Sequence, residues 1–429
     1  MKRLLMIFGL CAALCACAAQ LRLAPAPNVF REGNNYPEEF VPVSLRTASP
    51  DIFYVTDRVR ENGVYGSKRS SSMAFGRAQV KFGRDLSWEE LLEGTRADSN
   101  KAVSTLWVPE FEEIVRFEPT PLPFVREAGF LKHVPEVRSK YDNQTKEFQD
   151  ALRAKMRETG KNKVLVYVHG FNNDFDDSVT SLANLWHFTG RDSVPIAFTW
   201  PAGNGIGPLG YFRDRDSGTF AVHHTKEFLR MLADIPELAQ IDIVAHSRGT
   251  EVVSTALREQ MIFARGQGLH PKTAMKTGIL IMAAPDVGID IVRQRLMSER
   301  FSEGFEQVNL YVNPGDAALR LSAFLTRSRR LGALRDKDFG PNEVEILGRE
   351  GLVFFIQVED ERGGFGHGYF RSNPAVLSDI VLALRTRSFP GGALRPLEQK
   401  DNGIFLVHKN YPLERLPDIG FLSGDSYKR

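Results

Sequence analysis

The chain has 429 residues, of which 42% are hydrophobic, 10% aromatic and 25% charged, with 55 Lys and Arg against 53 Asp and Glu. These are the proportions of a globular protein, and they exclude disorder, collagen and a coiled coil as descriptions of the whole chain. The formal net charge of +2 excludes a strongly basic protein that coats nucleic acid, so we expect no nucleic-acid partner.

All three cysteines lie close to the N-terminus, at Cys11, Cys15 and Cys17. A disulfide framework or a cysteine-based zinc site is therefore excluded from the body of the protein. The adjacent His223 and His224 have no third ligand four residues away, and we expect neither a metal nor another cofactor.

The chain begins with two basic residues, Lys2 and Arg3, and an uninterrupted apolar stretch from Leu4 to Ala16. A stretch of this length suits the core of a signal peptide and is too short to span a bilayer comfortably. We therefore predict that residues 1–16 direct export and are then removed.

The end of this segment, Leu14-Cys15-Ala16-Cys17, resembles the bacterial lipobox, in which the last Cys becomes the lipidated N-terminus. Cys15 departs from the usual Ala or Ser, and ordinary cleavage after Ala18 or a neighbouring Ala is the alternative. We predict lipidation of Cys17, which would tether the protein to a membrane through its acyl groups. Ala18 in place of Asp favours the outer membrane, with the protein facing the periplasm.

Two N-terminal regions follow. Residues 17–50 carry five prolines without a sustained period, which predicts an extended linker. Residues 51–150 contain short β-like runs, and we expect a β-rich extension that packs on the core. Within it, the stretch from Arg138 to Arg157 has apolar residues at four-residue spacing and predicts a helix.

A regular pattern begins at Lys163, where continuous apolar runs are separated for the most part by amphipathic, helix-like stretches. Such runs are typical of a parallel sheet that is covered by helices on both faces. We assign residues 151–390 to this α/β core and residues 391–429 to a C-terminal tail. The six runs are 164–168, 195–200, 241–245, 278–284, 308–312 and 352–358.

The run at 241–245 leads through His246-Ser247-Arg248-Gly249 directly into a helix-like stretch. A tight strand–turn–helix with Ser at its apex is the geometry of a nucleophile elbow. The turn crowds the residues two before and two after the Ser, which here are the small Ala245 and Gly249. Such a turn exposes the hydroxyl and points the following helix N-terminus at it.

A nucleophilic Ser needs a base, and the base needs an acid that orients it. Asp316 follows the run 308–312, and His367 lies in a glycine-rich loop after the run 352–358. The order Ser247, Asp316, His367 predicts a catalytic triad. Asp286, also at a strand end, is the alternative acid. We favour Asp316 because it follows the strand next before His367.

The run 164–168 ends at His169-Gly170-Phe171, and the backbone N–H of Phe171 is one expected oxyanion donor. The second is the N–H of Arg248, the residue after the nucleophile. His169 and His246 are interpreted as structural. For the arginines between Arg320 and Arg335 we favour a solvated face over a surface that meets anionic lipid.

Together these segments resemble the α/β-hydrolase superfamily, in an uncharacterised bacterial branch of esterase/lipase type. The resemblance covers roughly residues 50–387, and Ala245 departs from the usual Gly. It implies the α/β-hydrolase fold with an N-terminal β-rich extension and an esterase-like activity without a cofactor. The matching segments are Phe53–Arg58, Val168–Asn173, Phe198–Pro201, Ala245–Gly249, Ala283–Asp286 and Gly366–Phe370.

We therefore expect an exported, lipid-anchored serine hydrolase of the cell envelope that acts on a small-molecule or lipid ester or a related acyl bond. Two rivals stay open. One is a non-catalytic envelope lipoprotein that uses the fold as a binding scaffold, and the other is an acyltransferase with the same triad. A protease is chemically feasible, but nothing in the sequence indicates peptide recognition.

Overall fold

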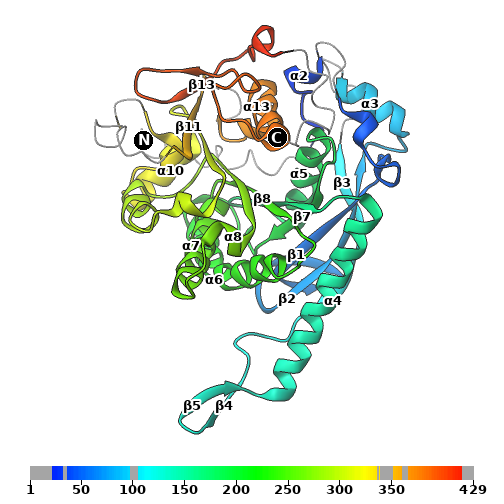
Figure 1. Ribbon diagram of the computed structural model, residues 1–429, viewed down its shortest axis with the longest axis vertical. Coiled ribbons are helices and arrows are strands. Elements are labelled where there is room, and N and C mark those ends of the chain that lie inside the picture. The colour runs from blue at the N-terminus through cyan, green and yellow to red at the C-terminus, as the bar shows by residue number, and fades with distance from the viewer. Residues whose placement is uncertain are drawn as a thin grey trace, which may run out of the picture.

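The centre of the molecule is one large sheet (Figure 1). Eleven strands of the described residues form it, in the order β12-β13-β11-β10-β9-β8-β6-β7-β1-β2-β3. The predicted signal peptide and Cys17 lie outside the described residues. The computed structural model describes residues 22–31, 36–96, 105–335, 338, 351–359 and 366–417.

The middle of the sheet is parallel, as expected from the continuous apolar runs. All six predicted runs are strands. The first five are buried almost completely because helices cover both sides of the sheet, and the sixth is partly buried. The predicted α/β class is therefore confirmed. These strands are β6 (Lys163–Val168), β7 (Val194–Thr199), β8 (Gln240–His246), β9 (Thr277–Ala283), β10 (Gln307–Val312) and β11 (Val353–Val358).

Two hydrophobic cores lie on opposite faces of the sheet. Alternate residues of β6 enter different cores, Leu165 and Tyr167 one and Val164 and Val166 the other, because strand side chains alternate between faces. The first core includes residues of α5 (Phe175–Phe188) and α13 (Pro374–Thr386). The second includes residues of α4 (Pro135–Thr159), α6 (Gly207–Ala233) and α7 (Gly249–Gly266).

The described residues of the segment 17–50 do not form the extended linker that we expected, because they pack on the first core. Leu23, Phe30 and Leu45 are buried there, and the short helix α2 (Asn28–Arg31) lies against α13. The prolines suggested an extended spacer, but the apolar side chains between them bury surface on folding and hold the segment in place.

The strands of the N-terminal extension continue the central sheet. β1 (Asp51–Glu61) pairs in parallel with β7, and β2 (Val64–Phe82) and β3 (Leu106–Arg116) follow in antiparallel order. The helix α3 (Trp88–Arg96) lies between β2 and β3 in the chain. A separate hairpin, β4 (Phe124–Glu127) with β5 (Phe130–His133), projects from the body at the N-terminal end of α4 (Figure 1).

The C-terminal region is also more ordered than the expected tail. β13 (Phe405–Val407) pairs in parallel with β11, and β12 (Glu398–Gln399) adds the edge. Arg395 is fully buried and forms an ion pair of 2.7 Å with Asp379 of α13. The segment up to residue 417 therefore packs on the first core, although strands this short leave no periodic signal in the sequence. Among the described helices, none has the length and apolar character needed to cross a bilayer.

Candidate active site

Ser247 stands at the sharp turn between β8 and α7. Its backbone is left-handed, with φ of 52°, a conformation that costs energy for a residue other than glycine. Its N–H donates to the carbonyl of Ala283 at 2.9 Å, and Thr250 donates its hydroxyl to the Ser247 carbonyl at 2.6 Å. These bonds hold the turn, and the predicted elbow is present.

Two glycines let neighbouring backbone approach this turn. A Cβ at position 249 would lie 2.3 Å from the carbonyl oxygen of His169. A Cβ at position 170 would lie 2.7 Å from the Cβ of Ser247. Only glycine fits at either position, so the loop after β6 is pressed directly against the elbow.

Ser247, His367 and Asp316 form one hydrogen-bonded chain. The Nδ1–H of His367 donates to Asp316 Oδ2 at 2.7 Å, since a carboxylate can only accept. The hydroxyl of Ser247 lies 2.9 Å from Nε2 of the same ring. Ser247 and Asp316 are separated from His367 by 120 and 51 residues along the chain, and the fold brings them together.

The electrostatics around His367 favour a charged imidazole. Burial alone would lower the pKa of His367, but the adjacent Asp316 carboxylate outweighs it and raises the pKa above its ordinary value. The neighbouring His246 behaves in the opposite way, because burial and the nearby His367 lower its pKa well below the usual range. His246 is therefore neutral and does not share the proton.

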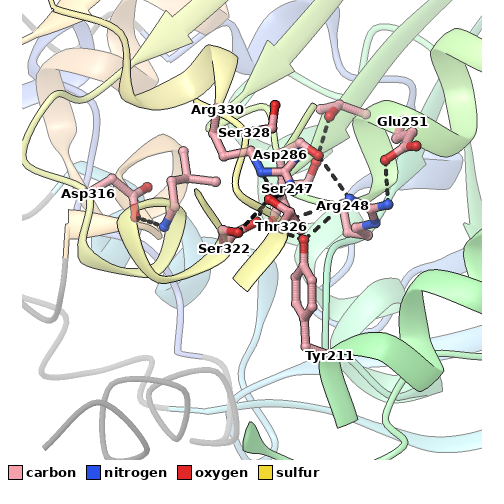
Figure 2. A network of polar contacts seen from close by, with 12 residues as sticks. Tyr211, Ser247, Arg248, Glu251, Asp286, Asp316, Ser322, Thr326, Ser328 and Arg330 are labelled. Carbon is pink, nitrogen blue, oxygen red and sulfur yellow. Dashed lines mark hydrogen bonds and ion pairs between the residues drawn. The ribbon is translucent and has the colours of Figure 1, made fainter. Parts of the chain in front are cut away.

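Asp286, the alternative acid, does not contact His367. Tyr211 and Ser322 donate their hydroxyls to it at 3.0 and 2.6 Å, and Arg330 lies 3.1 Å away (Figure 2). Arg248 is also close, at 3.6 Å. Burial opposes ionisation of Asp286, but the two guanidinium groups prevail and lower its pKa. Asp286 thus organises the Arg248 side chain beside the elbow.

The two expected oxyanion donors are free to receive a ligand. Among the described residues, the amides of Phe171 and Arg248 have no hydrogen-bond acceptor. The amides on either side of Phe171 are occupied: Gly170 donates to Asn173 Oδ1 at 3.3 Å and Asn172 donates to Asp214 Oδ2 at 2.8 Å. The loop is therefore held at both neighbours of Phe171.

Asp214 ties this loop to the next one. This carboxylate, buried in α6, also accepts from the amides of Gly203 and Asn204, at 3.2 and 3.0 Å, in the loop after β7. Sequence reasoning missed Asp214. The available signal was an acid on the buried face of a helix, three residues after Tyr211.

Arg58 of β1 holds the same two loops from the other side. Its guanidinium donates to the carbonyls of Asn173 and Ala202 at 2.8 and 2.9 Å and to the Thr199 hydroxyl at 2.8 Å. Burial lowers the pKa of Arg58 to about 10. The N-terminal strand, known from sequence only as a resemblance, thus supports the loop that carries Phe171.

Other candidates have structural roles. His224 donates to Asp57 at 3.0 Å, and the Thr120 hydroxyl contacts its other ring nitrogen at 3.0 Å, which joins α6 to the N-terminal strands. A cavity of about 600 Å³ lies between α4, α6 and α7, and none of the three residues of the hydrogen-bonded chain lines it. Within the described ranges, no cluster of His, Cys, Asp and Glu could hold a metal ion.

A mostly parallel sheet with helices on both faces and a strained Ser at the elbow after a central strand defines a hydrolase of the α/β-hydrolase fold. The chain belongs to the family described as alpha/beta hydrolase of unknown function (DUF900), whose model matches residues 144–385.

Two solved structures are similar to this chain at low identity. The monoclinic form of a Pyrobaculum calidifontis esterase is 10% identical over 53% of this chain and 77% of the esterase, with a TM-score of 0.29. A structure described as a hyperthermophilic esterase from the archaeon Pyrobaculum calidifontis is 11% identical over 53% and 75%, with a TM-score of 0.27. No curated protein matches the chain.

Proposed function

We propose that the protein is a serine hydrolase that cleaves a carboxylic ester or a related acyl bond. One observation carries this proposal: the chain of hydrogen bonds from Ser247 through His367 to Asp316, with Ser247 on a strained turn. A hydroxyl, an imidazole and a carboxylate in this order can activate the hydroxyl as a nucleophile.

In the first half of the reaction, Ser247 Oγ attacks the carbonyl carbon of the ester while its proton passes to His367 Nε2. The carbonyl oxygen becomes negatively charged and accepts from the amides of Phe171 and Arg248. Each such donor contributes about 2.7–4 kcal/mol to transition-state stabilisation. The ester C–O bond then breaks, and the leaving alcohol takes the proton from His367, which leaves an acyl-enzyme.

In the second half, a water molecule gives a proton to His367 and attacks the acyl carbon. The bond from that carbon to Ser247 Oγ breaks, and Ser247 recovers the proton. The products are a carboxylic acid and the alcohol. Asp316 accepts from Nδ1 throughout, which keeps Nε2 facing Ser247 and stabilises the transient imidazolium.

A fluorophosphonate probe tests the nucleophile, because it forms a covalent bond only with an activated serine. We expect labelling of the folded protein and none of the Ser247→Ala variant. Ser254→Ala, a matched change of another buried serine on α7, should label normally. Equal labelling of the wild type and Ser247→Ala would sink the proposal, as would no labelling of the folded wild type.

Transfer of the acyl group to an alcohol or amine in place of water uses the same residues. Product analysis with competing acceptors separates the two outcomes: free acid as the main product supports hydrolysis.

We also propose export and lipid anchoring through Cys17, a part of the chain outside the described residues. Metabolic labelling with a fatty acid should modify the wild type and not Cys17→Ala. Labelling of both proteins would overturn the anchor.

A further inference from the structure

Four large apolar side chains are exposed near the elbow, at the start of α6 and on α10 (Ala317–Thr326). The exposed fractions are 50% for Ile206, 63% for Leu209, 40% for Phe212 and 77% for Phe324. We call these four residues the rim. Exposed apolar groups of this size gain free energy by leaving water, so a rim of this kind marks a contact surface.

The rim flanks the candidate active site. Tyr211, which lies between Leu209 and Phe212, donates its hydroxyl to Asp286 and lies 2.7 Å from the Ser322 hydroxyl of α10. The amide of Asp286 in turn donates to the Ser247 carbonyl at 3.2 Å. Figure 2 shows Tyr211 and Ser322 approaching Asp286 from two sides, next to Ser247. The two rim helices therefore meet beside the predicted nucleophile.

The rim is presented by a well-braced loop. The loop before α6 contains left-handed glycines, among them Gly203 and Gly205, and Asp214 binds the Gly203 amide. A Cβ at position 210 would lie 1.8 Å from the Gly205 carbonyl oxygen, so the loop folds back onto the first turn of α6. The backbone that carries Ile206 and Leu209 is therefore fixed in place, and both side chains are exposed on it.

Arginines accompany the rim. Arg320 and Phe324 share the exposed face of α10, Arg327 follows at its end, and Arg213 is next to Phe212. None of these three guanidinium groups forms an ion pair with a described residue, whereas other surface arginines pair with glutamates, for example Arg153, Arg258 and Arg265. Asp216 lies one turn beyond Phe212, so Arg213, Arg320, Arg327 and Asp216 together carry a formal charge of +2.

We propose that the rim docks on a phospholipid surface, with its apolar side chains among the acyl chains and its arginines on the phosphates. The sequence alone favoured a solvated face for Arg320 and Arg327, and their position beside the exposed apolar side chains is the reason to assign them to a lipid surface instead. This proposal rests on the proposed function and names its substrate class: an acyl ester of a membrane lipid. Apolar and basic side chains together match the chemistry of a lipid interface. Asp174, Asp176 and Asp177 at the start of α5 belong to neither of the two rim helices.

The experiment reads which surface enters the bilayer. Tryptophan is introduced into the full chain at the rim (Leu209→Trp, Phe324→Trp) and, as a matched control, at the exposed hairpin tip (Leu131→Trp). Vesicles of phosphatidylcholine and phosphatidylglycerol with brominated acyl chains quench tryptophan that enters them. We expect about twofold more quenching for the two rim variants than for the wild type or Leu131→Trp. Quenching reports only whether the introduced tryptophan enters the bilayer. Binding of the vesicle by an apolar N-terminus therefore does not by itself produce the expected signal.

Three results would overturn the inference: no extra quenching at either rim position, equal or stronger quenching at Leu131→Trp, or a concentration-dependent change at Leu209→Trp without vesicles, which indicates a second copy or another protein as the occupant. Changing Arg320 and Arg327 together to Glu should weaken binding to the anionic vesicles about tenfold or more. Ser247→Ala should dock as the wild type does. A failure of docking is therefore distinct from a failure of the proposed chemistry, which the fluorophosphonate probe reports.

Discussion

Asp316 divides its carboxylate between two tasks, and His367 takes one of them. Oδ2 accepts from Nδ1 of His367 at 2.7 Å, while Oδ1 accepts from the Leu319 amide at 2.9 Å and caps the N-terminus of α10. A helix cap and an acid that orients an imidazole could compete for one carboxylate. In the structure they coexist, because the two oxygens face different partners, and the cap fixes the carboxylate toward the imidazole.

Asp316→Asn tests the orienting role. Asn caps helices as well as Asp does, so stability should change little, but the amide cannot stabilise the imidazolium. We expect hydrolysis of a soluble ester to fall by about 10⁴-fold. Activity of the wild type should rise with pH as His367 loses its proton, since the neutral ring is the base. Loss of the Asp316 charge should move this limb to lower pH. A larger fall for Asp286→Asn than for Asp316→Asn would contradict the assignment.

Asp286→Asn is expected to act mainly on stability. It leaves Arg330 buried without a carboxylate partner among the described residues, whereas Arg248 keeps its ion pair with Glu251. Breaking a buried ion pair in this way typically costs about 3–5 kcal/mol in the free energy of unfolding. Because the pKa of Asp286 is lowered in the folded state, its contribution is complete above the unfolded pKa of about 4 and is lost as pH falls through the folded value. Urea unfolding at neutral and acidic pH measures both effects. Equal destabilisation at all pH values would contradict the account.

Asp214→Asn should loosen the loop that carries Phe171. We expect kcat to fall by about 10–100-fold, within the contribution of one oxyanion donor, with little change in KM and no shift of the pH profile. The unchanged profile separates this positioning role from that of Asp316. Asp234→Asn, at the exposed end of the same helix, is the matched control and should behave as the wild type. A displaced pH profile for Asp214→Asn would argue against the role.

Gly249→Ala should damage the elbow. Its methyl group would meet the backbone oxygens of His169 and Val168 at 2.3 and 2.6 Å, and neither can move without shifting β6. We expect a loss of about 3 kcal/mol in stability and no fluorophosphonate labelling. Ala245→Gly removes a methyl group on the other side of the turn and creates no clash. This variant should keep the stability and the fluorophosphonate labelling of the wild type. Normal labelling of Gly249→Ala would show that the approach is less tight than the structure indicates.

Local and periodic signals in the sequence were sufficient for much of this result. Continuous apolar runs indicate buried parallel strands because helices cover both faces, and all six were found as strands. The small residues Ala245 and Gly249 indicate a tight turn at Ser247, because larger side chains at these positions would clash in such a turn in any fold. The chain order of Ser247, Asp316 and His367 and the loop with Phe171 could be read in the same way.

The tertiary structure decided what depends on contacts between distant residues. Asp316 and Asp286 both follow strands, and only the fold shows which one reaches His367. Residues 22–50 resemble a spacer in sequence because their prolines are a local signal. The core into which Phe30 and Leu45 pack is formed by residues far away in the chain, so no local signal indicates it. Asp214 and Arg58 carry no motif of their own, and their importance arises from backbone groups of two loops that only folding brings together. The sequence by itself therefore determined the buried strands, the tight turn and the types of reactive side chain. Which of these side chains contact one another was decided by three-dimensional packing.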